Sequence, residues 1–167
     1  AALALGQIGK NFDLKVTVLE QSTVFGEVGA GVQVSPNAYK VLCDWGLSDV
    51  VKQTVNFPEK IQVRSTATDK LLGQLELGNK AQLRYGYPFA TIHRADLHAL
   101  LLNAVRALTN VDLHLNAKIS HIVEENQQVK VSTETHESFT TDVLIGADGL
   151  RSRVREHVLG HADARPT

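Results

Sequence analysis

The sequence predicts an α/β fold that carries an antiparallel β insertion. The apolar, β-rich segment 14–19 (LKVTVL) is typical of a parallel strand buried on both faces. Helical spacing of apolar residues occurs both before and after the middle of the chain. Between these helices, residues 60–77 (KIQVRSTATDKLLGQLEL) alternate as two antiparallel strands with one solvated face. The 167 residues, 43% of them hydrophobic, suffice for one domain with a real core.

The first third of the chain contains two predicted helices. The opening residues AALALGQIGK read as the last turns of a buried helix, which Gly9 closes. After the strand at 14–19 comes a glycine-rich loop, FGEVGAGVQVS, and the pair Ser35-Pro36 then supplies an N-cap and a first helical residue. The second helix has one apolar stripe and ends at a glycine: Ala38, Val41, Leu42, Trp45 and Gly46.

The rest of the chain combines the hairpin, a longer helix and further strands. The hairpin turns near 68–70 and is followed by a loop rich in Gly and Tyr. Strands are expected at roughly 111–124, 128–134 and 143–145, and a short helix ends before Gly160. The longer helix starts at Ala95 and carries the apolar stripe Leu97, Leu100, Leu101, Ala104, Val105 and Leu108.

Composition narrows the possible partners. The net charge is −1, from 17 basic and 18 acidic residues, so neither nucleic acid nor an anionic membrane surface is an expected partner. No apolar run approaches the ~20 residues of a bilayer-spanning helix, so no membrane span is expected. The single Cys43 excludes an internal disulfide and fits a reducing compartment, so we expect a cytoplasmic location.

Both ends indicate an internal fragment. The sequence contains no methionine, and its opening stretch lacks the charged segment that begins a signal peptide. The last residues, Ala-Arg-Pro-Thr, follow closely on a predicted helix. We therefore expect a piece of a longer chain.

Three places have residues suited to a ligand. Glu20 ends the strand at 14–19, where an acidic side chain can accept hydrogen bonds from both hydroxyls of an adenosine ribose; a surface glutamate explains it equally well. The glycines of GEVGAGVQVSPNA let backbone approach a ligand, although a flexible connection has the same composition. Arg94 opposes the dipole at its helix start, which an anionic or polar ligand would offset, whereas Asp96 is a favourable charge there.

No catalytic group is expected within these 167 residues. The histidines show no HExxH spacing and one cysteine provides no thiolate cluster, so no metal site is expected. No serine lies in a nucleophile elbow, and no Cys–His pair can be argued. Binding features without an acid, base or nucleophile suit a protein whose cofactor carries the chemistry.

Four motifs in order, VTVLEQ, GEVGAGVQVSPNA, IHRADLHALL and DVLIGADGLRSRVR, resemble the single-component flavoprotein aromatic hydroxylases. The likeness is greatest to salicylate hydroxylase and its relatives acting on hydroxybenzoates or hydroxynicotinate, and it covers nearly the whole chain. It implies an FAD-binding dinucleotide fold with the antiparallel insertion, here incomplete because the first strand, its GxGxxG motif and the C-terminal part are missing. Residues 1–57 and 91–167 would be the FAD-binding parts of this partial domain, and 58–90 a β-hairpin contributed to the substrate domain.

The resemblance also implies which residues bind FAD. Glu20 matches the acidic residue that binds the adenosine ribose, with Gln21 beside it. Ala30 and Gly31 match backbone positions in the loop that runs past the flavin. Arg94 matches the arginine of the H-R-x-D-L motif, which contacts the cofactor near its ribityl and pyrophosphate portion.

Further matches lie in the second half of the chain. Ile119, in AKISHIVE, matches the position whose backbone contacts the adenine. Asp148 and Gly149 match an Asp-Gly motif that serves both FAD and reduced nicotinamide. We expect Asp148 to position the ribose or neighbouring backbone, Gly146 to let backbone pass close to a phosphate-bearing ligand, and Ser152 to cap the next helix. The arginines of this stretch meet either nicotinamide phosphates or solvent: Arg151, Arg153 and Arg155.

The implied activity is hydroxylation of an aromatic acid such as salicylate or a hydroxybenzoate. NADH or NADPH would reduce FAD and O₂ would be the second substrate, while the protein places the aromatic acid and excludes water. Two alternatives stay open: an FAD monooxygenase of another substrate branch, such as a ubiquinone-type hydroxylase or an epoxidase, and a non-catalytic, truncated nucleotide-binding remnant. The fragment alone is expected to be inactive.

Overall fold

The computed structural model describes residues 1–26 and 29–160. It is mixed α/β, as predicted, and divides into two compact units. Unit 1 contains Ala1–Val16 and Gly26–Val111, and unit 2 contains Thr17–Phe25 and Asp112–Thr167. Positions 27 and 28 of the predicted glycine-rich loop and the final segment 161–167 lie outside the described residues.

The predicted opening helix of unit 1 is confirmed as α1 (Ala2–Gly9). It packs against α5 (Arg94–Arg106) and the segment that follows α5. Gly6 permits this approach, because a Cβ there would lie 2.5 Å from Val111 Cγ2 and 2.6 Å from Leu108 Cδ1. The amide of Asn110 reinforces the contact by donating from Nδ2 to the carbonyl of Gly6 at 2.9 Å.

The core of unit 1 is built on two short antiparallel strands, β2 (Gly31–Val34) and β5 (Ala90–His93). Neither strand was predicted: residues 31–34 were assigned to the glycine-rich loop, and four residues are too few for a clear alternation. Helices α2 (Pro36–Asp44), α3 (Ser48–Thr54) and α5 contribute side chains to this core. Its buried members are Val34, Tyr39, Leu42, Val51, Ala90, Ile92 and Leu100.

Helix α2 begins where the sequence predicted. Pro36 is its first residue, Ser35 is the N-cap residue, and Gly46 follows its end with φ 77°. The cap differs in one respect, because the Ser35 hydroxyl donates to Asn37 Oδ1 at 2.6 Å instead of accepting a helix N–H. The helix that follows, α3, was not predicted.

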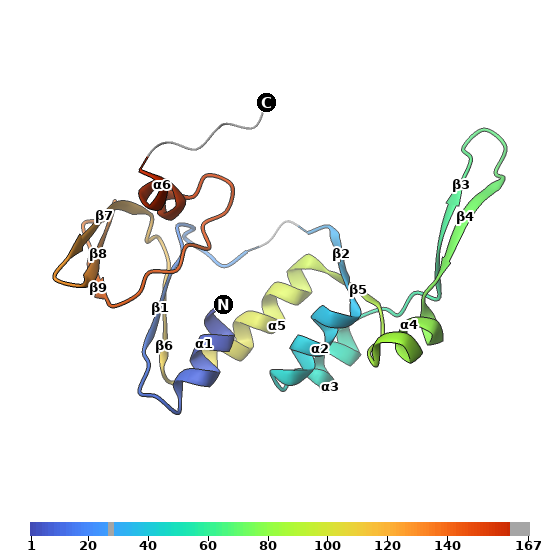
Figure 1. Cartoon of the computed structure of the whole chain (residues 1–167), viewed down its shortest axis with the longest axis horizontal. Coiled ribbons are helices and arrows are strands. Elements are labelled where there is room, and N and C mark those ends of the chain that lie inside the picture. The colour runs from blue at the N-terminus through green and yellow to red at the C-terminus, as the bar shows by residue number, and fades with distance from the viewer. Residues whose placement is uncertain (27–28, 161–167) are drawn as a thin grey trace. The chain divides into compact units, whose positions relative to one another are not determined.

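The predicted hairpin is confirmed as β3 (Lys60–Arg64) paired with β4 (Leu71–Glu76), the long ribbon of Figure 1. Every residue of both strands is exposed, so both faces of the hairpin are solvated, where one was expected. The prediction of a loop after the hairpin is wrong, because helix α4 (Gly78–Tyr85) forms there. This helix ends at Gly86, whose φ of 76° lies in the left-handed region. Such a φ is readily adopted only by glycine.

The strand predicted at 14–19 is confirmed in a shorter form, β1 (Val16–Leu19), which pairs with β6 (Val111–His114). Backbone hydrogen bonds from Val16 N–H to Asn110 O and from Glu20 N–H to His114 O advance in the same direction along both segments, so the pair is parallel. The prediction that both faces of this strand are buried was wrong, because none of the residues of β1 is fully buried.

The other strands of unit 2 form an antiparallel sheet: β7 (Ile119–Glu125), β8 (Gln128–Thr133) and β9 (Ser138–Thr141). The single strand expected at 111–124 is wrong, because Asn116, with φ 56°, lies between β6 and β7. Strand β9 was not predicted.

The strand expected at 143–145 is also wrong. These residues belong to no strand, and the side chains of Val143 and Ile145 are 70% and 55% exposed. A strand needs a neighbour that continues its hydrogen-bond ladder, and no described segment pairs with these residues. The helix that follows is confirmed as α6 (Arg153–Leu159), which packs on β7. Among the described residues, no helix combines the length and apolar character that crossing a membrane requires.

Candidate functional site

The residues predicted to bind the cofactor fall into two groups, one in each unit. Ala30, Gly31 and Arg94 belong to unit 1. The group in unit 2 consists of Glu20, Gln21, Ile119, Asp148 and Gly149.

In unit 1 the structure brings the three predicted residues together. Gly31 opens β2 and lies opposite His93, the last residue of β5. Just before β2 and just after β5, the Arg94 N–H donates to the Ala30 carbonyl at 3.0 Å, so the ladder continues one residue beyond the Gly31–His93 pair. Arg94 is the first residue of α5, where its side chain is exposed, and Asp96 lies in the first turn as predicted. The ladder therefore holds Ala30 and Gly31 directly beside the start of α5.

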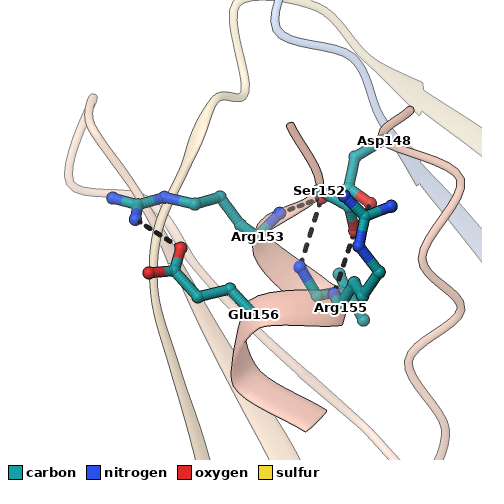
Figure 2. Close-up of polar contacts among 6 residues, drawn as sticks. Asp148, Ser152, Arg153, Arg155 and Glu156 are labelled. Atoms are coloured by element: carbon teal, nitrogen blue, oxygen red, sulfur yellow. Dashed lines mark hydrogen bonds and ion pairs between the residues drawn. The ribbon is translucent and has the colours of Figure 1, made fainter. Parts of the chain in front are cut away.

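In unit 2 the Asp148 carboxylate organises the start of α6 (Figure 2). Its Oδ1 accepts a hydrogen bond from the Ser152 hydroxyl at 2.5 Å, and its Oδ2 accepts from the backbone N–H groups of Arg153 at 2.6 Å and Val154 at 3.2 Å. Ser152 Oγ in turn accepts from the Arg155 N–H at 2.9 Å, which confirms Ser152 as the N-cap. Asp148 thus positions neighbouring backbone, one of its two expected roles.

These contacts explain the protonation behaviour of Asp148. Desolvation of the carboxylate acts to raise its pKa, but the hydrogen bonds from Ser152 Oγ and from the N–H groups of Val154 and Arg153 stabilise the charged form. The net result is a pKa held below the ordinary value of 3.8. Asp148 is therefore anionic at neutral pH, as a cap that accepts several N–H groups must be.

The arginines after Asp148 have distinct environments. Arg155 folds back on the turn, donating from Nη2 to the Leu150 carbonyl at 2.6 Å and from Nη1 to the Gly149 carbonyl at 3.5 Å. Arg153 points the other way and pairs with Glu156 at 3.1 Å, as Figure 2 shows. Arg151 is exposed. The sequence did not distinguish these three arginines, because the hydrogen bonds of Arg155 to the Leu150 and Gly149 carbonyls form only in the folded turn.

The turn before α6 lines an open hollow of about 550 Å³. The glycines in it serve different purposes. A Cβ on Gly146 would lie 2.7 Å from Val154 Cβ, so Gly146 makes room for α6. The expected approach of a ligand to the Gly146 backbone stays a prediction. Gly149 has φ 75°, and a Cβ on it would meet no atom within 4 Å, so this glycine is needed for the shape of the turn. The lining residues are Gly146, Ala147, Asp148, Gly149, Ser152, Val154, Arg155, Val158 and Leu159.

Glu20 and Gln21 follow directly on β1. The Glu20 N–H donates to His114 O at 2.9 Å and its carbonyl accepts from the Ala117 N–H at 2.8 Å, so the backbone of Glu20 is held on both sides. Its carboxylate oxygen Oε1 accepts the Ser22 N–H at 2.8 Å. The side chain of Gln21 is exposed.

Ile119 is the half-buried first residue of β7. It lines a second hollow, of about 330 Å³, and not the hollow that Asp148 lines. The structure therefore does not bring these two predicted residues together in one cavity. No cluster of potential metal ligands occurs among residues 1–26 and 29–160.

The chain matches known proteins over nearly its whole length, although no family model matches it. It is 37% identical to 3-hydroxybenzoate 6-hydroxylase 1 from Aquipseudomonas alcaligenes, over 99% of this chain and 41% of that protein. It is 34% identical to 6-hydroxynicotinate 3-monooxygenase from Pseudomonas fluorescens, over 96% of this chain and 40% of that protein. The resemblance to flavoprotein aromatic hydroxylases is confirmed. The chain spans about 40% of the length of these curated relatives.

Solved structures show the same likeness. The crystal structure of a 2-methyl-3-hydroxypyridine-5-carboxylic acid oxygenase variant matches with a TM-score of 0.73 and 29% identity, over 94% of this chain and 38% of that one. An HpxO variant from Klebsiella pneumoniae, crystallised with FAD, matches with a TM-score of 0.80 and 24% identity, over 98% of this chain and 41% of that one. The mixed α/β fold is thus one found in part of FAD-binding monooxygenase structures.

Proposed function

We propose that this chain is part of an FAD-dependent monooxygenase that uses NADH or NADPH and O₂ to hydroxylate an aromatic acid, such as salicylate or a hydroxybenzoate. One observation carries the proposal: 99% of the chain aligns at 37% identity with a hydroxylase named for a hydroxybenzoate. The name of a second relative refers to hydroxynicotinate, which is likewise an aromatic acid that carries a hydroxyl group. A cytoplasmic location goes with this proposal and is supported by the single cysteine.

The residues of unit 1 suit the polar, phosphate-bearing part of FAD. Gly31 is exposed and has no atom within 4 Å of the place of a Cβ, so a ligand can lie against its backbone. Arg94, fixed beside Ala30 by the 3.0 Å backbone bond, presents an exposed guanidinium at the same place. Arginine pairs well with phosphate because its planar group donates two parallel hydrogen bonds. These three residues would hold FAD in unit 1.

In unit 2, Glu20 and Gln21 would contact the ribose, Ile119 the adenine, and Gly149 the cofactor through its backbone. The fit of Glu20 is supported by its fixed backbone and by Oε2, the carboxylate oxygen that the Ser22 N–H does not engage. Asp148 differs, because both of its oxygens accept hydrogen bonds from the start of α6. Asp148 would therefore act through the turn that it shapes. When bound, FAD supplies the redox and oxygen chemistry of the reaction.

We assign residues 1–57 and 91–167 to FAD binding and residues 58–90 to the substrate domain. The β3–β4 hairpin supports this division. Its register places Ile61 opposite Leu75 and Val63 opposite Gly73, so one face of the ribbon is apolar although exposed. An apolar face of this kind is suited to packing within a larger sheet.

The test is to express the complete coding sequence and purify its product. The expected protein is yellow, shows flavin absorbance, and oxidises NADH or NADPH faster when a hydroxylated aromatic acid is added. With ¹⁸O₂ the product should carry one labelled oxygen, and a non-aromatic carboxylic acid should give no stimulation. A colourless protein that ignores added FAD would overturn the proposal.

A further inference from the structure

The imidazole of His93 lies on the backbone of Gly29. A Cβ built on Gly29 would stand 1.9 Å from His93 Cε1, 2.5 Å from Nε2 and 2.8 Å from Nδ1. Real Cβ atoms are essentially never found this close to another heavy atom, so the ring occupies the place that any side chain at position 29 would take. The absence of a side chain at Gly29 and the position of the ring are therefore linked.

The pairing of β2 with β5 explains this contact. His93 lies opposite Gly31 in the antiparallel register, so these two residues share one face of the ribbon, and Gly29 lies two residues before Gly31, just outside β2. No atom comes within 4 Å of a Cβ position on Gly31. The ring therefore leans diagonally over Gly29 and leaves the backbone of Gly31 open.

This arrangement holds Ala30 from two sides. Its carbonyl accepts the Arg94 N–H at 3.0 Å, and the preceding residue, Gly29, is covered by the His93 ring. Ordering a flexible segment on binding costs conformational entropy, and a segment that is already ordered avoids part of this cost. The segment that would meet the cofactor is thus in contact with His93 on one side and with the start of α5 on the other.

We propose that His93 is a positioning residue, whose imidazole packs on Gly29 and keeps the segment Gly29–Gly31 seated beside Arg94. This inference rests on the proposed function, because its consequence is tighter FAD binding. It assigns His93 no proton transfer and no direct contact with the substrate. The flat shape of the ring is what matters, so another flat ring should replace it.

The first experiment measures the Kd for FAD in the full-length protein by flavin fluorescence. We expect His93→Ala to raise the Kd about tenfold and His93→Phe to stay within about twofold of the wild type. His121→Ala is the matched control, since His121 is an exposed histidine of β7 in unit 2. Thermal unfolding of the FAD-free proteins should change little for all three variants, which separates positioning from a general loss of stability.

The second experiment is a double-mutant cycle with Gly29→Ala. The added methyl group collides with the imidazole of His93, and the three atoms nearest to its position all belong to that ring, so His93→Ala removes the collision. We expect Gly29→Ala to raise the Kd about tenfold in the wild-type background and less than about twofold in the His93→Ala background.

The outcomes separate this inference from the function on which it rests. A wild-type protein that binds no FAD overturns both. A wild type that binds FAD, together with an unchanged Kd in His93→Ala or an equal effect of Gly29→Ala in both backgrounds, overturns the role of His93 and leaves the proposed function standing.

Discussion

Two glycine-containing segments of this protein solve the same packing problem with different partners. In unit 1, Gly29 leaves room for the exposed imidazole of His93. In unit 2, Gly146 leaves room for Val154, which is only 8% exposed. In each case the missing Cβ lets a side chain from a later element lie directly on the backbone. Glycine here serves close packing as much as flexibility.

The two segments differ in what fastens them. The first is held by uncharged groups, the β2–β5 ladder and the bond from Arg94 N–H to the Ala30 carbonyl. The second is held by the charged carboxylate of Asp148, which collects the first N–H groups of α6. A ladder has no titratable group, whereas a carboxylate cap depends on pH. The segment in unit 1 is therefore held independently of pH, whereas the segment in unit 2 depends on the charge of Asp148.

The largest expected effect on stability comes from adding a side chain at Gly146, and the same change at Gly29 should have a much smaller effect. Gly146→Ala should lower the free energy of unfolding by about 2 kcal/mol, because the new methyl group meets a buried, β-branched valine. Gly29→Ala should cost less than about 0.5 kcal/mol, because an exposed imidazole can rotate away. Urea denaturation of both variants checks this; equal losses would remove the distinction between the two sites.

A smaller effect is expected from removing the cap. Asp148→Ala leaves the Arg153 and Val154 N–H groups without their acceptor and should cost about 1–2 kcal/mol, and Ser152→Ala about 1 kcal/mol. Amide hydrogen exchange should show the loss at the start of α6. Asp142→Ala is the control, because its carboxylate accepts a 3.3 Å bond from the side chain of the exposed residue Gln128. A loss as large in the control would show that the capping geometry is irrelevant.

The pH dependence of unit 2 should follow the protonation of Asp148. Its pKa in the folded protein is lower than the ordinary 3.8, so between the two values the unfolded chain binds more protons. The stability that this group contributes is therefore present above the ordinary pKa and is lost as the pH falls through the folded pKa. The difference in unfolding free energy between wild type and Asp148→Asn should shrink below about pH 4. A difference that stays constant down to about pH 2 would contradict this.

The smallest effect on folding is expected at Arg94. Arg94→Ala keeps the backbone bond to Ala30, so the free energy of unfolding should change by less than about 0.5 kcal/mol. Retention of FAD in the full-length protein should nevertheless weaken, with Arg94→Lys intermediate because lysine lacks the planar fork. Equilibrium dialysis against FAD measures this; an unchanged affinity would count against a cofactor role for Arg94.

Local signals predicted the parts of the fold that local chemistry determines. The Ser35-Pro36 start of α2 and the limits of α6, from Ser152 to Gly160, follow from residues whose own backbone preferences favour a helix end. The hairpin around 68–70 follows from alternation on both sides of a polar turn. These signals act within a few residues, so they can be read from the sequence.

The pairing of strands could be predicted less well from the sequence. Residues 143–145 have the composition of a buried strand, yet no described segment pairs with them. Conversely, the residues of β2 were assigned to a glycine-rich loop, and they form a strand because they pair with β5. Strand formation depends on a partner distant in sequence, which composition does not specify.

The sequence by itself determined the start of α2, the limits of α6, the hairpin, the resemblance to flavoprotein hydroxylases and the position of the Asp-Gly turn. Only the tertiary structure decided that His93 lies on Gly29, that Val154 lies on Gly146, and that both oxygens of Asp148 face the start of α6. The physical reason is that packing and hydrogen bonding are set by distances of a few ångströms between atoms. A sequence contains the residues that can make such contacts, and the folded backbone determines which of them meet.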